Sequence, residues 1–275
     1  MFAAMLAYAQ SAAELNNSGV ALRLASRPAE AIEAFNRAIK IAEDTGDQRL
    51  LATALGGLGA TLVDLGEFAR AQPVLRRSLA LFEKTTGPDS IEAGEAAMNL
   101  AMVYRKNGDL AQAQEKLERA LPLMEKYLGA QSPVLAMAFN NMFIVLVEQK
   151  GAEQKQWDNA EPYVMRALEI AKALPESVQL AEIEENLALL EAHRGQFHEA
   201  ARTMELVIAI EERAIEARTL RPEDPRLALS ARVQSLESYS RYLKKINQRA
   251  QARQAEDRAK AIRVGQVSDL PIPGR

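Results

Sequence analysis

The 275-residue sequence contains no cysteine, which excludes disulfide bonds, cysteine nucleophiles and cysteine-ligated zinc sites. It has only two histidines, so few side chains are available for a metal site or for imidazole acid–base catalysis. The formal net charge of −3 gives no overall attraction to nucleic acid or to anionic membranes. No apolar run approaches the roughly 20 residues that a membrane-spanning helix needs. We therefore expect neither a nucleic-acid partner nor a membrane span.

Alanine and leucine dominate what is present, while aromatic residues make up only 5%. Both alanine and leucine lose little conformational freedom on entering a helix. Hydrophobic residues account for 48% of the chain and charged residues for 26%, which is ordinary for a folded protein. No alternating strand pattern of useful length occurs, so the composition predicts an all-α fold.

Small residues recur along the chain at fixed intervals. A small residue precedes a loop, an alanine follows twelve positions later, and another small or slim residue comes seven positions after that. In most copies a large apolar residue lies four positions after the alanine. The members of these four sets are Gly19, Gly59, Ala101, Ala188 and Ser240; Ala31, Ala71, Ala113, Ala200 and Ala252; Ala38, Ser78, Ala120, Val207 and Ala259; and Phe35, Leu75, Leu117 and Met204.

This spacing predicts pairs of antiparallel helices, which we name helix A and helix B of each repeat. Small side chains at the crossing let two helix axes approach to about 8 Å, and the large residue one turn later fills the adjacent groove. Gly66, Gly108 and Gly195 fall between A and B, where a left-handed C-terminal cap is expected, and Ser26 and Asn247 take that place in the outer copies. One such hairpin cannot bury its apolar face alone, so the hairpins must stack.

A sixth copy is distorted, with Phe143, Ala160 and Ala167 at the small positions and an insertion that we interpret as a lengthened turn over residues 151–159. Together the copies predict twelve helices. Their expected ranges are 12–25, 29–45, 48–65, 68–86, 90–107, 110–128, 133–150, 158–174, 177–193, 197–219, 225–246 and 249–264.

These positions resemble those of the tetratricopeptide repeat, and the runs at 15–17, 97–133 and 159–174 are similar to the kinesin-light-chain-type subfamily. The resemblance covers about residues 12–264. It implies a right-handed α–α superhelix, a solenoid of about six helix-turn-helix repeats. Residues 1–11 are expected to be an N-terminal segment, either a signal-peptide remnant or a packing helix, and residues 265–275 a disordered tail.

Four features could suggest chemistry or ligand binding, and for each we favour a structural explanation. His193 and His198 flank a turn and are expected to be exposed. The glycine-rich run at 56–62 lies within a predicted helix, so we expect close helix packing instead of a nucleotide-binding loop. The adjacent pairs Glu184–Glu185 and Glu211–Glu212 point about 100° apart on a helix and are expected on a solvated face. The basic C-terminal end could bind RNA or a membrane, and we favour a solubilising cap on the final hairpin.

In the family, the A helices line the inner surface, and extended peptides or helices bind there. One A-helix position carries Asn17, Asn99, Asn141 and Asn186, although asparagine is a middling helix former. Its amide can bind both the N–H and the C=O of a peptide backbone, as asparagines at this position do in related repeats. Hydrogen bonding between repeats is the alternative explanation.

Neighbouring inner positions complete the candidate peptide-binding set. Methionine is flexible and suits a groove for varied apolar partners, although some of these residues could simply be core. Cations near the helix ends could steer an acidic partner or only complement the helix dipole. The further candidates are Met98, Met102, Met137, Asn140, Ile144, Arg105 and Lys106. Some members of the family bind the terminal carboxylate of a chaperone through a set of lysine, asparagine and arginine side chains. We do not expect such binding here, because Glu95, Val20 and Met102 stand at three of those positions.

The resulting hypothesis is a non-enzymatic scaffold that binds a protein or peptide partner in the groove and needs no cofactor or metal. A regulatory sensor that responds to a ligand or peptide is the alternative, and a helical enzyme is a second rival. The expected location is the cytoplasm, with export as the alternative if residues 1–9 end a signal peptide.

Overall fold

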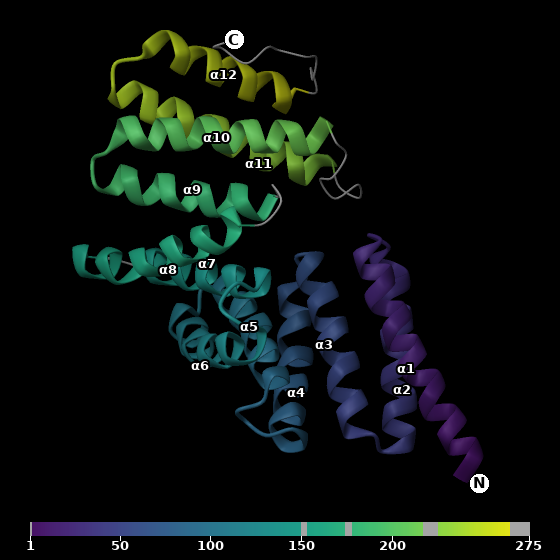
Figure 1. The fold of residues 1–275 in the computed structure, drawn as a ribbon. Coiled ribbons are helices and arrows are strands. Elements are labelled where there is room, and N and C mark those ends of the chain that lie inside the picture. The colour runs from purple at the N-terminus through teal and green to yellow at the C-terminus, as the bar shows by residue number, and fades with distance from the viewer. Residues whose placement is uncertain (1, 150–152, 174–177, 217–224, 265–275) are drawn as a thin grey trace. The chain divides into compact units, whose positions relative to one another are not determined.

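The computed structural model describes residues 2–149, 153–173, 178–216 and 225–264, and every regular element in these ranges is an α-helix (Figure 1). The chain divides into two compact units, Met1–Ala152 and Glu153–Arg275. We describe each unit by itself. The predicted tail at 265–275 lies outside the described residues.

In the first unit each helix packs against the next one along the chain, as expected for consecutive hairpins. The A helices are α1, α3, α5 and α7, and the B helices are α2, α4 and α6. The bounds are α1 Phe2–Leu24, α2 Pro28–Thr45, α3 Gln48–Asp64, α4 Phe68–Thr85, α5 Ile91–Lys106, α6 Leu110–Leu128 and α7 Pro133–Glu148.

The second unit follows the same rule, with each helix again packed on its successor in the chain. It begins with a B helix, α8, and continues with two hairpins. Its bounds are α8 Gln154–Lys172, α9 Val178–His193, α10 Phe197–Glu216, α11 Pro225–Lys245 and α12 Arg249–Arg263.

The repeated small residues lie where helices cross, which confirms the central prediction from the sequence. All five alanines at the first B-helix position are fully buried, and so are the large apolar residues one turn later in four of the copies. The last copy has Glu256 at this place, and its exposed carboxylate accepts hydrogen bonds from Ser240 Oγ and Lys244 Nζ of α11.

The turns between A and B helices also have the expected backbone. Gly66, Gly108 and Gly195 have φ values of +73°, +81° and +76°, and Ser26 and Asn247 have +64° and +62°. A left-handed residue at this place ends helix A and lets its last carbonyls accept hydrogen bonds from the turn.

Two helix starts differ from the prediction. α1 begins at Phe2, ten residues before the expected start, so most of the predicted N-terminal segment continues the helix. α8 begins at Gln154, within the stretch expected to be a lengthened turn. The Glu153 N–H donates to Oε1 of Gln156 at 2.9 Å, which satisfies a donor at the start of α8 and favours an earlier start.

Candidate functional site

The A helices of the first unit share one face of the stack. The backbones of α1 and α3, of α3 and α5, and of α5 and α7 approach one another closely, whereas the backbones of α2, α4 and α6 stay further apart in the described residues. Hairpins that are close on the A side and apart on the B side curve toward the A helices. We call the surface formed by α1, α3, α5 and α7 the inner face of the first unit.

Ion pairs connect successive A helices near this face. Arg23 Nη1 of α1 lies 2.9 Å from Asp64 Oδ2 of α3. Arg105 Nη1 of α5 lies 3.3 Å from Glu148 Oε1 of α7, and only 13% of the Arg105 side chain is exposed. Arg105, predicted as a cation that could steer a partner, is therefore already engaged within the unit.

The structure distributes the predicted binding residues unevenly between surface and interior. Asn17 and Lys106 are exposed, and Asn99, Met102, Met137 and Ile144 are partly exposed. Met98, Asn140 and Asn141 are buried. Asn186 is partly exposed on α9, and it belongs to the second unit, whereas the other candidates lie in the first.

Gly57 holds the position that carries asparagine in other repeats, and the structure gives the reason. A Cβ atom added at Gly57 would lie 2.3 Å from Cε1 of Phe35, the large residue of the preceding B helix. An added Cβ at Gly19 would lie 2.8 Å from the same Cε1 atom. The Phe35 ring therefore needs glycine on both sides. The glycine-rich run lies inside α3, as predicted.

The second unit contains a charged cluster formed by the buried residues Glu211 and Glu212 of α10, Ser235 of α11 and Arg258 of α12, together with the partly exposed Arg232 of α11. Ser235 Oγ donates to Glu211 Oε1 at 2.9 Å, and both arginines pair with Glu212. Burial is the main cause that raises the pKa of Glu211 to about 7, and the Ser235 hydrogen bond opposes the rise.

The prediction that the paired glutamates lie on a solvated face is wrong for three of them. Glu211 and Glu212 are 8% and 9% exposed, and Glu184 is 2% exposed with Lys172 Nζ at 3.3 Å from its Oε1. Glu185 is half-buried, and burial together with nearby Glu182 raises its pKa. Packing against helices that carry cations, which the local pattern does not show, accounts for the difference.

Both histidines are exposed, as predicted. The His193 ring stacks on Trp157 of α8, with 3.9 Å between ring centroids and 7° between planes. His193 Nε2 also lies 3.2 Å from Gln154 Oε1. These contacts connect the end of α9 to the start of α8. The sequence predicted a lengthened loop there instead of a helix. No group of three metal-ligating side chains occurs within the described ranges.

The helices thus define a class of proteins built from stacked helical hairpins. A family model described as tetratricopeptide repeat matches residues 10–84, 92–154 and 151–213, and the chain belongs to this family. The all-α repeat fold is therefore confirmed. A search of curated proteins found no match. In the part of the chain that the structure describes, no helix is long and apolar enough to cross a membrane.

Solved structures show the same fold at low sequence identity. BtubC (BKLC) from P. vanneervenii is 21% identical, with 89% of this chain and 94% of that chain covered and a TM-score of 0.66. A putative kinesin light chain from Podosopora anserina is 23% identical, with coverage of 78% and 96% and a TM-score of 0.56. A Rap protein complexed with competence and sporulation factor is 12% identical, with coverage of 94% and 65% and a TM-score of 0.60.

Proposed function

We propose that this protein is a non-enzymatic adaptor that binds an extended peptide or a helix of a partner protein along the inner face of the first unit. The observation that carries the proposal is the row of A helices with polar amides and partly exposed apolar side chains on one surface. A cytoplasmic location stays a prediction of the sequence.

The side chains on this face are suited to a backbone-directed, adaptable contact. Asn99 is partly exposed on α5, one turn before Met102, and its amide offers two donors and an acceptor to a peptide backbone. Met102, Met137 and Ile144 supply apolar surface, which methionine can adapt to different side chains. Lys106 adds an exposed cation at the end of α5.

The buried members of the predicted set have a different role in this proposal. Met98, Asn140 and Asn141 lie in the interior of the first unit and support the helices that present the exposed residues. The Rap protein complexed with competence and sporulation factor shares the fold, so this architecture is compatible with holding another molecule.

A two-stage experiment tests the proposal. A photo-crosslinking amino acid at Met102 identifies the bound partner in the native host, and a synthetic peptide of the crosslinked segment is then titrated against the purified chain. We expect Asn99→Ala to weaken binding about five- to tenfold, the loss of roughly one hydrogen bond. Glu118→Ala, an exposed change on the B helix α6, should leave the dissociation constant unchanged.

Thermal unfolding of Asn99→Ala should match the unchanged chain, because the side chain is only partly buried. Equal affinities for the Asn99→Ala chain and the unchanged chain would remove the asparagine from the site. Crosslinking at Glu118 in preference to Met102 would move the site away from the inner face and contradict the proposed function.

A further inference from the structure

A repeated ion pair joins successive B helices, apart from the inner face. The arginine stands immediately before the second small residue of a B helix, and the glutamate stands five residues after that small residue in the preceding B helix. Arg77 pairs with Glu43 at 2.7 Å, and Arg119 and Arg258 pair with Glu83 and Glu212. The same two positions are thus paired at three junctions between repeats.

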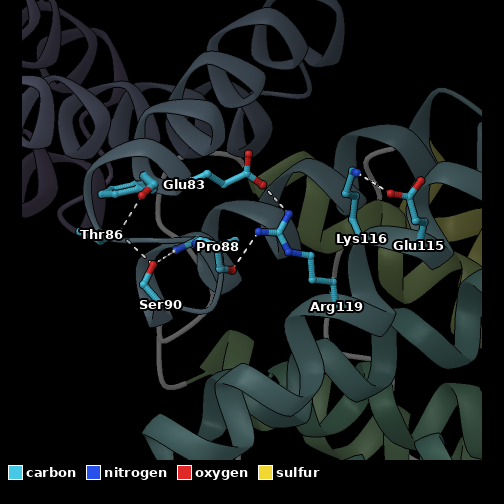
Figure 2. Close-up of polar contacts among 9 residues, drawn as sticks. Glu83, Thr86, Pro88, Ser90, Glu115, Lys116 and Arg119 are labelled. Atoms are coloured by element: carbon cyan, nitrogen blue, oxygen red, sulfur yellow. Dashed lines mark hydrogen bonds and ion pairs between the residues drawn. The ribbon is translucent and has the colours of Figure 1, made fainter.

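Figure 2 shows the pair between α4 and α6. Arg119 contacts the Glu83 carboxylate and also donates from Nη2 to the Pro88 carbonyl at 2.8 Å. The arginine therefore recognises the carboxylate near the C-terminal end of the preceding B helix. Where this pair forms, a helix of the preceding repeat is packed beside it.

Arg37 occupies the arginine position in the first repeat, immediately before Ala38. It is exposed, and no carboxylate pairs with it among the residues that the structure describes. It lines an open groove of about 610 Å³ between α1 and α2, formed by Glu14, Leu15 and Ser18 of α1 and Arg37, Lys40 and Ile41 of α2. The groove contains two cations and one carboxylate, and Lys40 also pairs with Asp44 at 3.7 Å. Arg37 is therefore the cation in the groove that favours an acidic partner.

The corresponding surface of the next repeat, formed by α3 and α4, packs against the B helix α2. Leu15 and Ser18 precede Leu55 and Leu58 by forty residues, the spacing between Gly19 and Gly59. Leu55 belongs to the cluster that packs α3 on α2. In the first repeat Leu15 is partly exposed and Ser18 is polar, so this surface is less apolar than its counterpart. Such a surface suits reversible docking better than permanent stacking.

We propose that the groove between α1 and α2 is a second interaction surface, which docks an acidic amphipathic helix of a partner protein. The carboxylate near the C-terminal end of that helix pairs with Arg37, in the arrangement that Glu43 and Arg77 have inside the chain. Leu15 and Ile41 contact its apolar side. Binding weakens as salt rises, because the pair is exposed.

The probe is a capped synthetic peptide with the sequence of α2, residues 28–45, titrated against the full chain at low salt. This helix carries Glu43 and already docks in the same way within the chain. We expect Arg37→Glu to weaken peptide binding at least about fivefold, and Glu14→Gln to strengthen it about twofold. A peptide with Glu43→Arg should bind the Arg37→Glu chain better than the unchanged peptide does.

The matched control is Arg77→Glu, which changes the same position one repeat later. If peptide binding depends on Arg77 instead of Arg37, the peptide is replacing α2 inside the fold and the proposal fails. Absence of binding at millimolar peptide, or equal binding to the Arg37→Glu chain, also overturns it. The chain could instead associate with itself, bind no peptide and lose the self-association in the Arg37→Glu variant. That result would assign the surface to a second copy of the chain and overturn the proposal of an acidic helix from a partner protein.

Discussion

Replacing Gly57 by asparagine is expected to lower the free energy of unfolding of the first unit by about 2–3 kcal/mol, the upper part of the roughly 1–3 kcal/mol that overpacking a core usually costs. A Cβ atom there would lie 2.3 Å from Cε1 and 2.5 Å from Cζ of Phe35. The ring is fully buried, and its Cε1 atom also packs against Gly19, where an added Cβ atom would lie 2.8 Å away. A rigid ring held in this way cannot move aside at low cost. Urea unfolding followed by circular dichroism measures the loss.

The same contact predicts a rescue by a second substitution. The following junctions have Leu75 before Asn99 and Leu117 before Asn141, so a leucine leaves room for the amide. In a Phe35→Leu background, Gly57→Asn should therefore cost almost nothing more. The double-mutant cycle is expected to give a coupling energy of about 2 kcal/mol.

Gly56→Ala is the matched control for this cycle, because its added Cβ would meet only Ser78 Oγ, at 3.3 Å. It should change the free energy of unfolding by less than about 1 kcal/mol, since the better helix propensity of alanine offsets the tight contact. If the effects of Gly57→Asn and Phe35→Leu simply add, the two residues do not compete for the same space.

The fold could be predicted because its information is local and repeated. A small residue fits a helix crossing only at certain intervals, so the intervals themselves give the helix pairs and the turns. Where a turn is set by a cap instead of by this spacing, as at Glu153 and Gln156, the predicted start of α8 was wrong by four residues. The predicted lengthened turn is helical from Gln154 onward for that reason.

The site was predicted less completely, since exposure depends on neighbours that are far apart in the sequence. Asn99 and Asn141 share one repeat position, yet Asn99 is partly exposed and Asn141 is buried. The spacing places both on the same helix face and gives no measure of the packing around each. Gly57, which interrupts the asparagine positions, could have been connected with Phe35, because Phe35 is the only aromatic side chain among the large residues after the alanines.

The buried glutamates show the same limit for charged groups. Adjacent glutamates on a helix usually lie in solvent, and no local signal marks Glu212 as the partner of two arginines. Those arginines are 20 and 46 residues further along the chain. Only the packing of α11 and α12 on α10 brings them together, and it leaves Glu211 buried beside them.

The second unit should become less stable as the pH rises from about 4.5 to about 7, and this change should depend on Glu211. The carboxyl has a pKa of about 7 in the folded unit, against 4.5 for an unperturbed glutamate. The unfolded chain therefore loses this proton at lower pH than the folded chain, so stability falls across this interval and is constant above it. Burial is the largest cause, with Glu185 and Glu212 acting in the same direction and Arg232 opposing them.

Glu211→Gln keeps an acceptor for Ser235 and removes the charge, so it should stabilise the second unit by on the order of 2 kcal/mol at pH 8 and by almost nothing near pH 4.5. The only tryptophan, Trp157, lies in this unit and reports its unfolding by fluorescence. Glu205→Gln, an exposed change on the same helix, is the control and should show no such pH-dependent gain. A gain from Glu211→Gln that is equal at pH 5 and pH 8 would show that Glu211 is ionised in the folded unit throughout this range, and that its burial does not shift its titration.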